Sequence, residues 1–227
     1  MLVQTLGILV FSCALAVGTA RAADVVEKGK VARTPEGLVP AGWKVRAKAE
    51  GDLNGDGRAD VALALERNEP VKEEESTGNN VDDDDIGPRF LLVAIRTAGA
   101  YRVVSTSGTA VLCKQCGGFG DPVNNISIKK GVMVIAHYGG SAAKWWYVDR
   151  YRFHNGDFRR IGALHGSRSA DGDEYVVDTN LLNGAQITTI HCGTDRDDVA
   201  VACHDKVKKG HVPKKPLVSI SEVGPVE

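Results

Sequence analysis

The sequence lacks the charge excess on which nucleic-acid and membrane-surface binders depend. Its 227 residues contain 28 Lys and Arg against 29 Asp and Glu, a formal net charge of -1. Proteins that bind phosphate backbones or anionic lipids use a basic surplus, so we expect no nucleic-acid partner. Helical periodicity is also almost absent, which points away from an α-helical fold.

The sequence has only one long apolar run, at its beginning. The stretch 6–17 is too short to span a bilayer and is followed by Ala20-Arg21-Ala22, the small-x-small pattern of a signal peptidase site. We expect a signal peptide over 1–22 with cleavage after Ala22; the alternatives are a buried N-terminal strand or helix and a lipoprotein signal that uses Cys13. We expect no stable membrane insertion after cleavage. The mature protein is therefore expected to be periplasmic or secreted.

Motifs for catalysis are largely missing. There is no phosphate-binding loop, and Ser141, although close in sequence to His137 and Asp149, lacks the second glycine of a nucleophile elbow. Acidic residues that could supply a carboxylate pair are Asp171, Asp173, Glu174 and Asp178. Acids in turn regions are ordinarily solvated, so we expect a non-enzymatic protein. The alternative is an exported hydrolase that acts on envelope polymers.

What the sequence does contain is a β pattern. Hydrophobic residues make up 43% of the chain, enough for a core, and short alternating runs are separated by turn signals, among them Asn155-Gly156, which favours a type I′ hairpin. The expected strands are 43–49, 60–65, 89–96, 101–105, 125–129, 132–138, 144–153, 158–164, 174–178, 185–192 and 199–203. This pattern predicts an all-β fold, an antiparallel β-sandwich or propeller-blade-like sheet.

Two segments differ in composition from the rest of the chain. Residues 66–85 contain nine acidic residues and two basic ones, and we expect a solvated acidic loop inserted over 66–88. The Lys- and Pro-rich segment 205–227 is expected to be a flexible tail. One β-rich domain should therefore span 23–204.

One expected strand is unusually rich in aromatic residues. Trp145, Trp146, Tyr147 and Tyr151 fall within seven positions. Large rings on both faces of a strand, one set in the core, would explain this pattern. A stripe of rings for stacking against sugars would explain it as well, and both interpretations remain open.

Four cysteines follow the expected signal peptide. An even number in an exported chain predicts two disulfides, and we favour the local pairs Cys113–Cys116 and Cys192–Cys203. One alternative is a thiol redox centre at Cys113 and Cys116, although the glycine-rich run after Cys116 cannot begin the helix that such centres use. Another is a zinc site. Its ligands would be Cys113, Cys116 and two of Cys192, Cys203, His191 and His204.

The stretch from Asp52 to Asp60 predicts a calcium site. It matches D-x-N-x-D-G-x-x-D, which puts hard oxygen donors at every second residue of a tight loop. The expected ligands are the side chains of Asp52, Asn54, Asp56 and Asp60 and the carbonyl of Arg58. The motif is not an EF-hand, because position twelve is a leucine and strands are expected on both sides. A polar hairpin that binds no metal is the alternative.

This stretch resembles the calcium-loop hairpin of FG-GAP and VCBS repeat proteins, the repeats that build integrin-type β-propellers. The resemblance is specific over residues 43–66, and weaker similarity to exported bacterial proteins that carry one such element covers most of 43–190. A propeller repeats this motif several times, whereas the motif occurs once here, so a full propeller is not expected.

The resemblance implies an exported β-rich protein with a structural calcium ion and no established activity. From this we expect a calcium-stabilised, non-enzymatic binding or interaction protein. Its partner would be an unknown envelope protein or glycan.

Overall fold

A computed structural model of the chain describes residues 26–68, 87–193 and 204–223. The fold is all-β, as predicted, with two antiparallel sheets and one short 3-10 turn, η2 (Glu36–Leu38). The five-stranded sheet has the order β1 (Val31–Ala32), β5 (Ala100–Ser107), β4 (Arg89–Thr97), β3 (Asp60–Arg67), β2 (Trp43–Gly51). The seven-stranded sheet has the order β12 (Lys206–His211), β11 (Ala185–His191), β10 (Glu174–Asn180), β9 (Asp157–Arg168), β8 (Lys144–His154), β7 (Val132–Gly140), β6 (Val123–Lys129).

Local sequence signals account for most of these strands. Ten of the eleven expected strands coincide with β2–β11, and the eleventh, 199–203, lies outside the described residues. The β8–β9 hairpin turns at Asn155 and Gly156, whose φ angles of 51° and 78° are the positive values that a type I′ turn requires.

The central strands of the five-stranded sheet are buried on both faces. One face packs against the seven-stranded sheet, where Ala62, Ala64, Leu91 and Val93 meet Met133, Ile135, Tyr151 and Phe158. The other packs against the N-terminal segment, where Val61, Leu63, Leu65 and Phe90 meet Val26 and Leu38. Burial on both faces explains why β3 and β4 read as continuous apolar runs, since neither face needs polar side chains for solvation.

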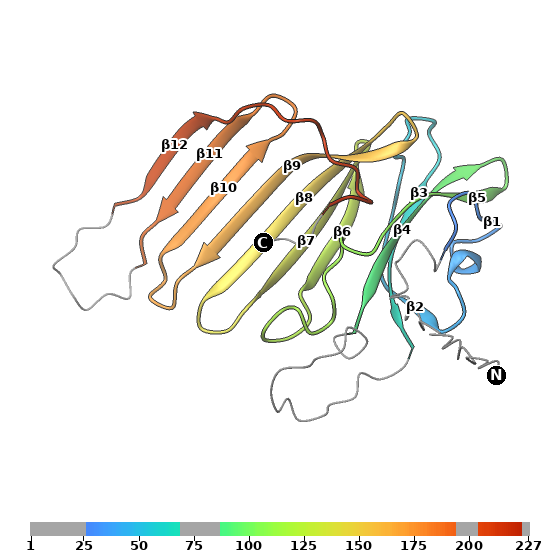
Figure 1. The fold of residues 1–227 in the computed structure, drawn as a ribbon, viewed down its shortest axis with the longest axis horizontal. Helices are drawn as coiled ribbons and strands as arrows, with labels where there is room; N and C mark the ends of the chain where they lie inside the picture. Colours follow the sequence, from blue (N-terminus) through green and yellow to red (C-terminus); the bar gives the residue numbers. More distant parts are fainter. Residues whose placement is uncertain (1–25, 69–86, 194–203, 224–227) are drawn as a thin grey trace, which may run out of the picture.

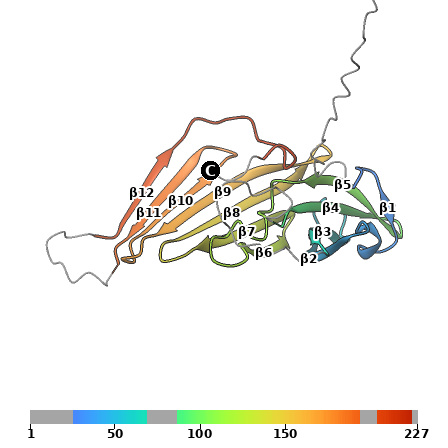
Figure 2. The ribbon, with the colours of Figure 1, turned by 60° about the horizontal axis from the view of Figure 1, so that its bottom comes forward.

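The two sheets approach each other most closely at β2 and β6. A Cβ on Gly51 of β2 would lie 2.6 Å from Cγ2 of Ile128 on β6, so this contact depends on glycine. Beyond β9 the seven-stranded sheet continues past the five-stranded one, and Figures 1 and 2 show β10–β12 projecting to one side. Among the described strands, β10–β12 make substantial contacts only with their neighbours in the sheet.

The C-terminal segment corrects one prediction. Residues 206–211 form the edge strand β12, paired with β11, instead of a loose tail. The chain then returns to β9, where Arg160 N–H donates to the Val218 carbonyl and Ile220 N–H to the Phe158 carbonyl. Ile220 and Val223 are buried in the core between the sheets. The flexible-tail prediction is wrong for the described residues, because pairing with β11 holds 206–211 in a strand and the side chains of Ile220 and Val223 complete the core.

Two further predictions fall on residues that are not described. The expected signal peptide and most of the acidic loop lie outside the described residues. Within the described ranges, no helix has the length and apolarity needed to cross a membrane.

Candidate functional site

Alternate residues of β8 place an unusual set of side chains on one face of the seven-stranded sheet. The set comprises Trp145, Tyr147, Asp149 and Tyr151. We call this the inner face, because Tyr151 enters the core between the sheets. Cross-strand pairing continues the inner face from β8 across β9 to β10. One row of partners consists of Trp145, Ser167 and Tyr175, and the next row consists of Tyr147, His165 and Val177.

Aromatic rings gather where the inner face leaves the core. The rings of Trp145 and Tyr147 stack with centroids 4.9 Å apart and an interplanar angle of 28°, and His165 meets Tyr147 edge-on at 5.1 Å. Trp145 and Tyr147 are half-buried, whereas His165 is exposed and Tyr175 is 51% exposed. The face therefore offers partly exposed rings over three neighbouring strands.

Gly139 on β7 gives the Trp145 ring its position. The two residues are cross-strand partners, and a Cβ on Gly139 would lie 2.3 Å from the Trp145 ring. Any side chain at residue 139 would push the ring away. The ring can thus lie across β7 only because residue 139 is glycine.

A cluster of polar side chains lies at the inner end of these rings. Asp149 and Tyr151 are buried, and Asp149 Oδ1, Tyr151 OH and Arg160 Nε find no hydrogen-bond partner among the described residues. Arg160 Nη1 approaches Asp149 Oδ1 at 3.6 Å. Burial raises the pKa of the Asp149 carboxyl, and the nearby Arg160 cation offsets this only in part. We call these three residues the open cluster.

The opposite, outer face carries the other members of the aromatic strand. Trp146 lies there, and a Cβ on Gly166 would come within 2.0 Å of its ring. Glu174 and Asp178 also point to the outer face, where Arg168 lies 4.0 Å from Glu174 and Arg150 donates to Asp178 at 2.8 Å. Of the four acids proposed from the sequence for a carboxylate pair, Glu174 and Asp178 are thus on the other side of the sheet from Asp149, and Asp171 and Asp173 lie in the turn between β9 and β10.

A second buried polar cluster joins the two sheets. The Arg89 side chain has no exposed surface and donates to Glu66 Oε2 at 2.6 Å and to both oxygens of Asp121 at 2.6 and 2.7 Å. Arg46 adds a 2.7 Å bond to Asp121, and Lys44 lies 3.4 Å from Glu66. Although burial alone would raise it, these bonds hold the pKa of Asp121 well below its usual range. We call this the closed cluster.

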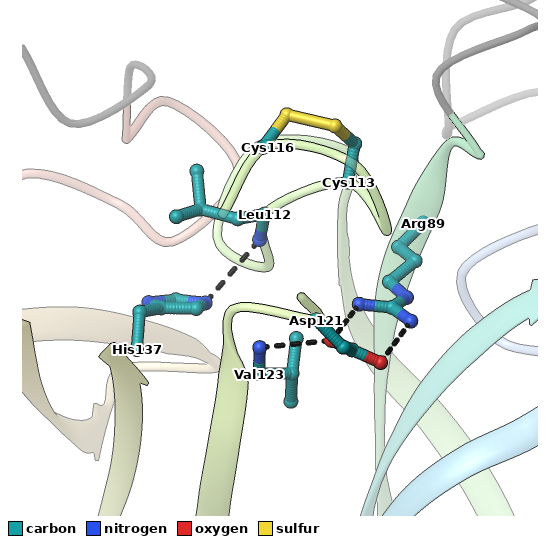
Figure 3. The surroundings of a disulfide bond; sticks show 7 residues. All are labelled: Arg89, Leu112, Cys113, Cys116, Asp121, Val123 and His137. Atoms are coloured by element: carbon teal, nitrogen blue, oxygen red, sulfur yellow. Dashed lines mark hydrogen bonds and ion pairs between the residues drawn. A yellow bond between two sulfur atoms is a disulfide. The ribbon is translucent and has the colours of Figure 1, made fainter. Parts of the chain in front are cut away.

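His137 lies beside the closed cluster (Figure 3). Its Nε2 accepts a hydrogen bond from Leu112 N–H at 3.2 Å, so the proton of the neutral ring is on Nδ1. Burial, with the nearby Arg89 cation, lowers the pKa of His137 to about 4. Because Nε2 is already occupied, His137 does not act as a base for Ser141, which lies in the exposed turn after β7.

The expected calcium loop connects β2 to β3 and is closed by its own amides. Asp52 accepts N–H bonds from Gly55, Asp56 and Gly57, and hydrogen bonds to backbone amides lower the pKa of its carboxyl. Asp56 is bonded to the Arg58 side chain at 2.9 Å. The motif therefore folds as a tight polar turn.

Asp60 ties this loop to the neighbouring strand. Asp60 is fully buried, and its two oxygens accept 2.8 Å bonds from Leu53 N–H and Arg96 N–H. Burial raises the pKa of Asp60, and the Asp56 and Asp52 carboxylates raise it further.

The donor chemistry of the loop suits calcium, but the described arrangement does not converge on an ion. Asn54 Oδ1 accepts the N–H of Asp56, and the Arg58 guanidinium neutralises Asp56. Over the described ranges, no group of three or more His, Cys, Asp or Glu side chains is arranged to hold a metal ion. The calcium site stays a prediction.

Of the two expected disulfides, Cys113–Cys116 is present between β5 and β6. Cys192, at the end of β11, is also disulfide-bonded. Its expected partner, Cys203, lies outside the described residues, so that pairing remains a prediction.

Comparison with protein-family models, with curated proteins and with solved structures finds no match. The FG-GAP and VCBS resemblance therefore rests on the residues that suggested it. Sequence reasoning missed Arg160, His165 and Tyr175 as members of the inner face. It also missed the whole closed cluster.

Proposed function

We propose that this chain is an exported, non-enzymatic carbohydrate-binding protein that calcium stabilises. Its glycan would bind on the inner face of β8–β10. The observation that carries the proposal is the set of partly exposed rings, Trp145, Tyr147 and Tyr175, where the sheet extends beyond the five-stranded one. The N-terminal signal pattern and the Cys113–Cys116 disulfide support export.

The spacing of the rings suits an extended ligand. Trp145 and Tyr175 occupy one row two strands apart, so their backbones lie roughly 9.6 Å apart. Flat aromatic surfaces stack on the apolar C–H face of a sugar ring, and the polar ends of Trp and Tyr remain available to hydroxyl groups. A chain of several sugar rings would contact both ends of the row.

Arg160 supplies a polar contact beside the rings. Its side chain is 26% exposed, and a guanidinium can donate hydrogen bonds to the hydroxyl groups of a sugar. Asp149 Oδ1, Tyr151 OH and Arg160 Nε are buried and have no hydrogen-bond partner among the described residues, so a ligand on the surface would contact the exposed part of the guanidinium and not these three atoms.

The arrangement of carboxylates favours binding over hydrolysis. Most glycoside hydrolases use two carboxyl groups that flank the bond to be cleaved. Asp149 is the single carboxylate that the described strands β6–β12 place on the inner face, since Glu174 and Asp178 are on the outer face. The face can hold a glycan without a second acid to cleave it.

Two neighbouring tryptophans give a matched test of the binding face. We expect calorimetry with cellotetraose, chitotetraose and an alginate tetramer to detect binding of at least one. Trp145→Ala should weaken that binding at least about tenfold, or 1.4 kcal/mol, whereas Trp146→Ala on the outer face should leave it unchanged. Equal losses in the two variants, or no binding of any of the three by the wild type, would contradict the proposal.

Calcium stabilisation has its own test. Calcium would have to displace the Arg58 guanidinium from Asp56. A hundredfold excess over Kd would stabilise the fold by about 2.7 kcal/mol. We expect chelator-treated protein to gain melting temperature in about 10 mM calcium, above the range of weak extracellular sites.

Two substitutions separate calcium binding from a general salt effect. Asp56→Ala should abolish the calcium-dependent rise, because it removes a ligand. Arg58→Ala should keep or enlarge the rise, because it removes the competing cation. No heat of binding and no thermal shift in the wild type would identify the loop as a polar turn only.

A further inference from the structure

The Cys113–Cys116 disulfide differs strongly in exposure at its two ends. Cys113 is 8% exposed, whereas Cys116 is exposed on the turn that precedes Gly117. The bond spans a sequence separation of only three residues. Since the stabilisation from closing a loop grows with loop length, this small ring contributes less to folding than a longer one.

The segment that carries the disulfide is also held in place by other bonds. Before it, Leu112 N–H donates to His137; after it, the Gly117 carbonyl accepts from Gly140 N–H at 2.8 Å. Further on, Asp121 is bonded to Arg89. The segment can therefore keep its place when the sulfur–sulfur bond opens.

One exposed aromatic side chain follows the outer sulfur closely in the sequence. Phe119, three residues after Cys116, is 82% exposed, which is the largest value among the exposed large hydrophobic residues described. It lies between Gly118 and Gly120, whose φ angles of 75° and 86° belong to a tight turn that favours glycine. An exposed phenyl ring three residues from an exposed sulfur suits docking of another protein at this turn.

We propose that Cys113–Cys116 is a thiol–disulfide exchange site whose partner is a protein dithiol. The partner's thiolate attacks Sγ of Cys116, the Cys113–Cys116 bond breaks, and Cys113 leaves with the electron pair as a thiolate. The partner's second thiolate then attacks its own sulfur in the mixed disulfide and releases Cys116 as a thiolate. Two electrons pass from the dithiol to this chain, and the partner's two protons end on Cys113 and Cys116.

The difference in exposure of the two sulfurs favours this direction of attack. Cys116 is exposed and Cys113 is only 8% exposed, so an attacking thiolate of another protein reaches Cys116 first. Figure 3 shows the bond and the residues around it.

The two single-cysteine variants test the proposed direction, because each removes the same bond. With glutathione disulfide as the probe, Cys113→Ser should form a mixed disulfide at Cys116 at least tenfold faster than Cys116→Ser forms one at Cys113, as followed by mass spectrometry. Circular dichroism should show the same fold in both variants. Equal rates would overturn the proposal.

Wild-type protein tests whether the bond opens in the folded state. Dithiothreitol should reduce Cys113–Cys116 faster than the protein unfolds. Reduction only at the rate of global unfolding would overturn the proposal. Phe119→Ser should slow reduction by thioredoxin several-fold while leaving the dithiothreitol rate unchanged, and the absence of that difference would overturn the protein-docking part.

Discussion

The closed and open clusters are both buried groups of charged residues, but they differ in how completely their polar atoms are bonded. In the closed cluster, the buried Arg89 guanidinium meets two carboxylates at 2.6–2.7 Å, and further cations meet the same carboxylates. In the open cluster, Arg160 approaches Asp149 only at 3.6 Å, and three polar atoms have no hydrogen-bond partner in the part of the chain that is described.

The difference lies in how far each cluster offsets the cost of burying its charges. Removing a charge from water costs free energy that only close, well-oriented partners offset. The closed cluster offsets this cost within the protein, so its contribution is to dock the two sheets. The open cluster leaves part of this cost in place, because Asp149 Oδ1, Tyr151 OH and Arg160 Nε are buried without a hydrogen-bond partner among the described residues.

Breaking the closed cluster should have the largest effect. Arg89→Met leaves Glu66 and Asp121 without their buried cation, and we expect a loss of about 4 kcal/mol in the free energy of unfolding, measured by urea denaturation. The matched control is Arg150→Met, which breaks the half-exposed pair with Asp178 and should cost less than about 1 kcal/mol. Comparable losses in both variants would remove the distinction between buried and surface pairs.

Acid should weaken the junction beside the closed cluster through His137. Its pKa is lowered to about 4 in the folded protein, below the ordinary value of 6.5, so the unfolded chain binds a proton first. The stabilising effect is complete above about pH 6.5 and is lost as the pH falls toward 4, by roughly 3 kcal/mol in total.

A variant isolates this contribution of His137. His137→Gln keeps an acceptor for Leu112 N–H but cannot be protonated, so its unfolding free energy should vary less between pH 6.5 and 4. Identical slopes in wild type and His137→Gln would show that another group controls the acid response.

Removing the charge of Asp149 from the open cluster should change the free energy of unfolding least, and it should increase stability where the other changes decrease it. Because burial raises the pKa of Asp149, its charge opposes folding at neutral pH. Asp149→Asn should therefore raise the free energy of unfolding at pH 7 by less than Arg89→Met lowers it, and the gain should shrink as the pH falls and the Asp149 carboxylate takes up a proton. Loss of stability would mean that Asp149 is a structural partner of Arg160.

Strand positions could be predicted because their signals are local. Glycine-containing turns such as Asn155-Gly156 and alternating runs mark β2–β11 in the sequence. Strand β12 escaped prediction because Lys206–His211 has little apolar alternation, and its strand conformation comes from pairing with β11. The packing of the C-terminal residues against β9 could have been predicted in part. Apolar and polar residues alternate at Val218, Ser219 and Ile220, although a Lys- and Pro-rich stretch precedes them.

The inner face could be predicted only in part. Trp145, Tyr147 and Asp149 occupy alternate positions of the expected strand 144–153, so their side chains lie on the same face of the sheet. Their neighbours could not be assigned, because the pairing of β8 with β9 shifts by one residue between Arg150 and Tyr151 and brings Arg160 onto the inner face. The closed cluster joins Arg89 to Asp121, 32 residues apart, and forms only when the two sheets dock.

The lysines of β12 also bear on solubility. Among the described strands this one is an edge of the seven-stranded sheet, so one side of its backbone has no neighbour within that part of the chain. Such an edge is a template for pairing with an edge of another molecule. Lys206, Lys208 and Lys209 place positive charge along it, and two such edges brought together would repel each other. The charges that made this segment look like a tail thus protect the open end of the sheet from edge-to-edge aggregation.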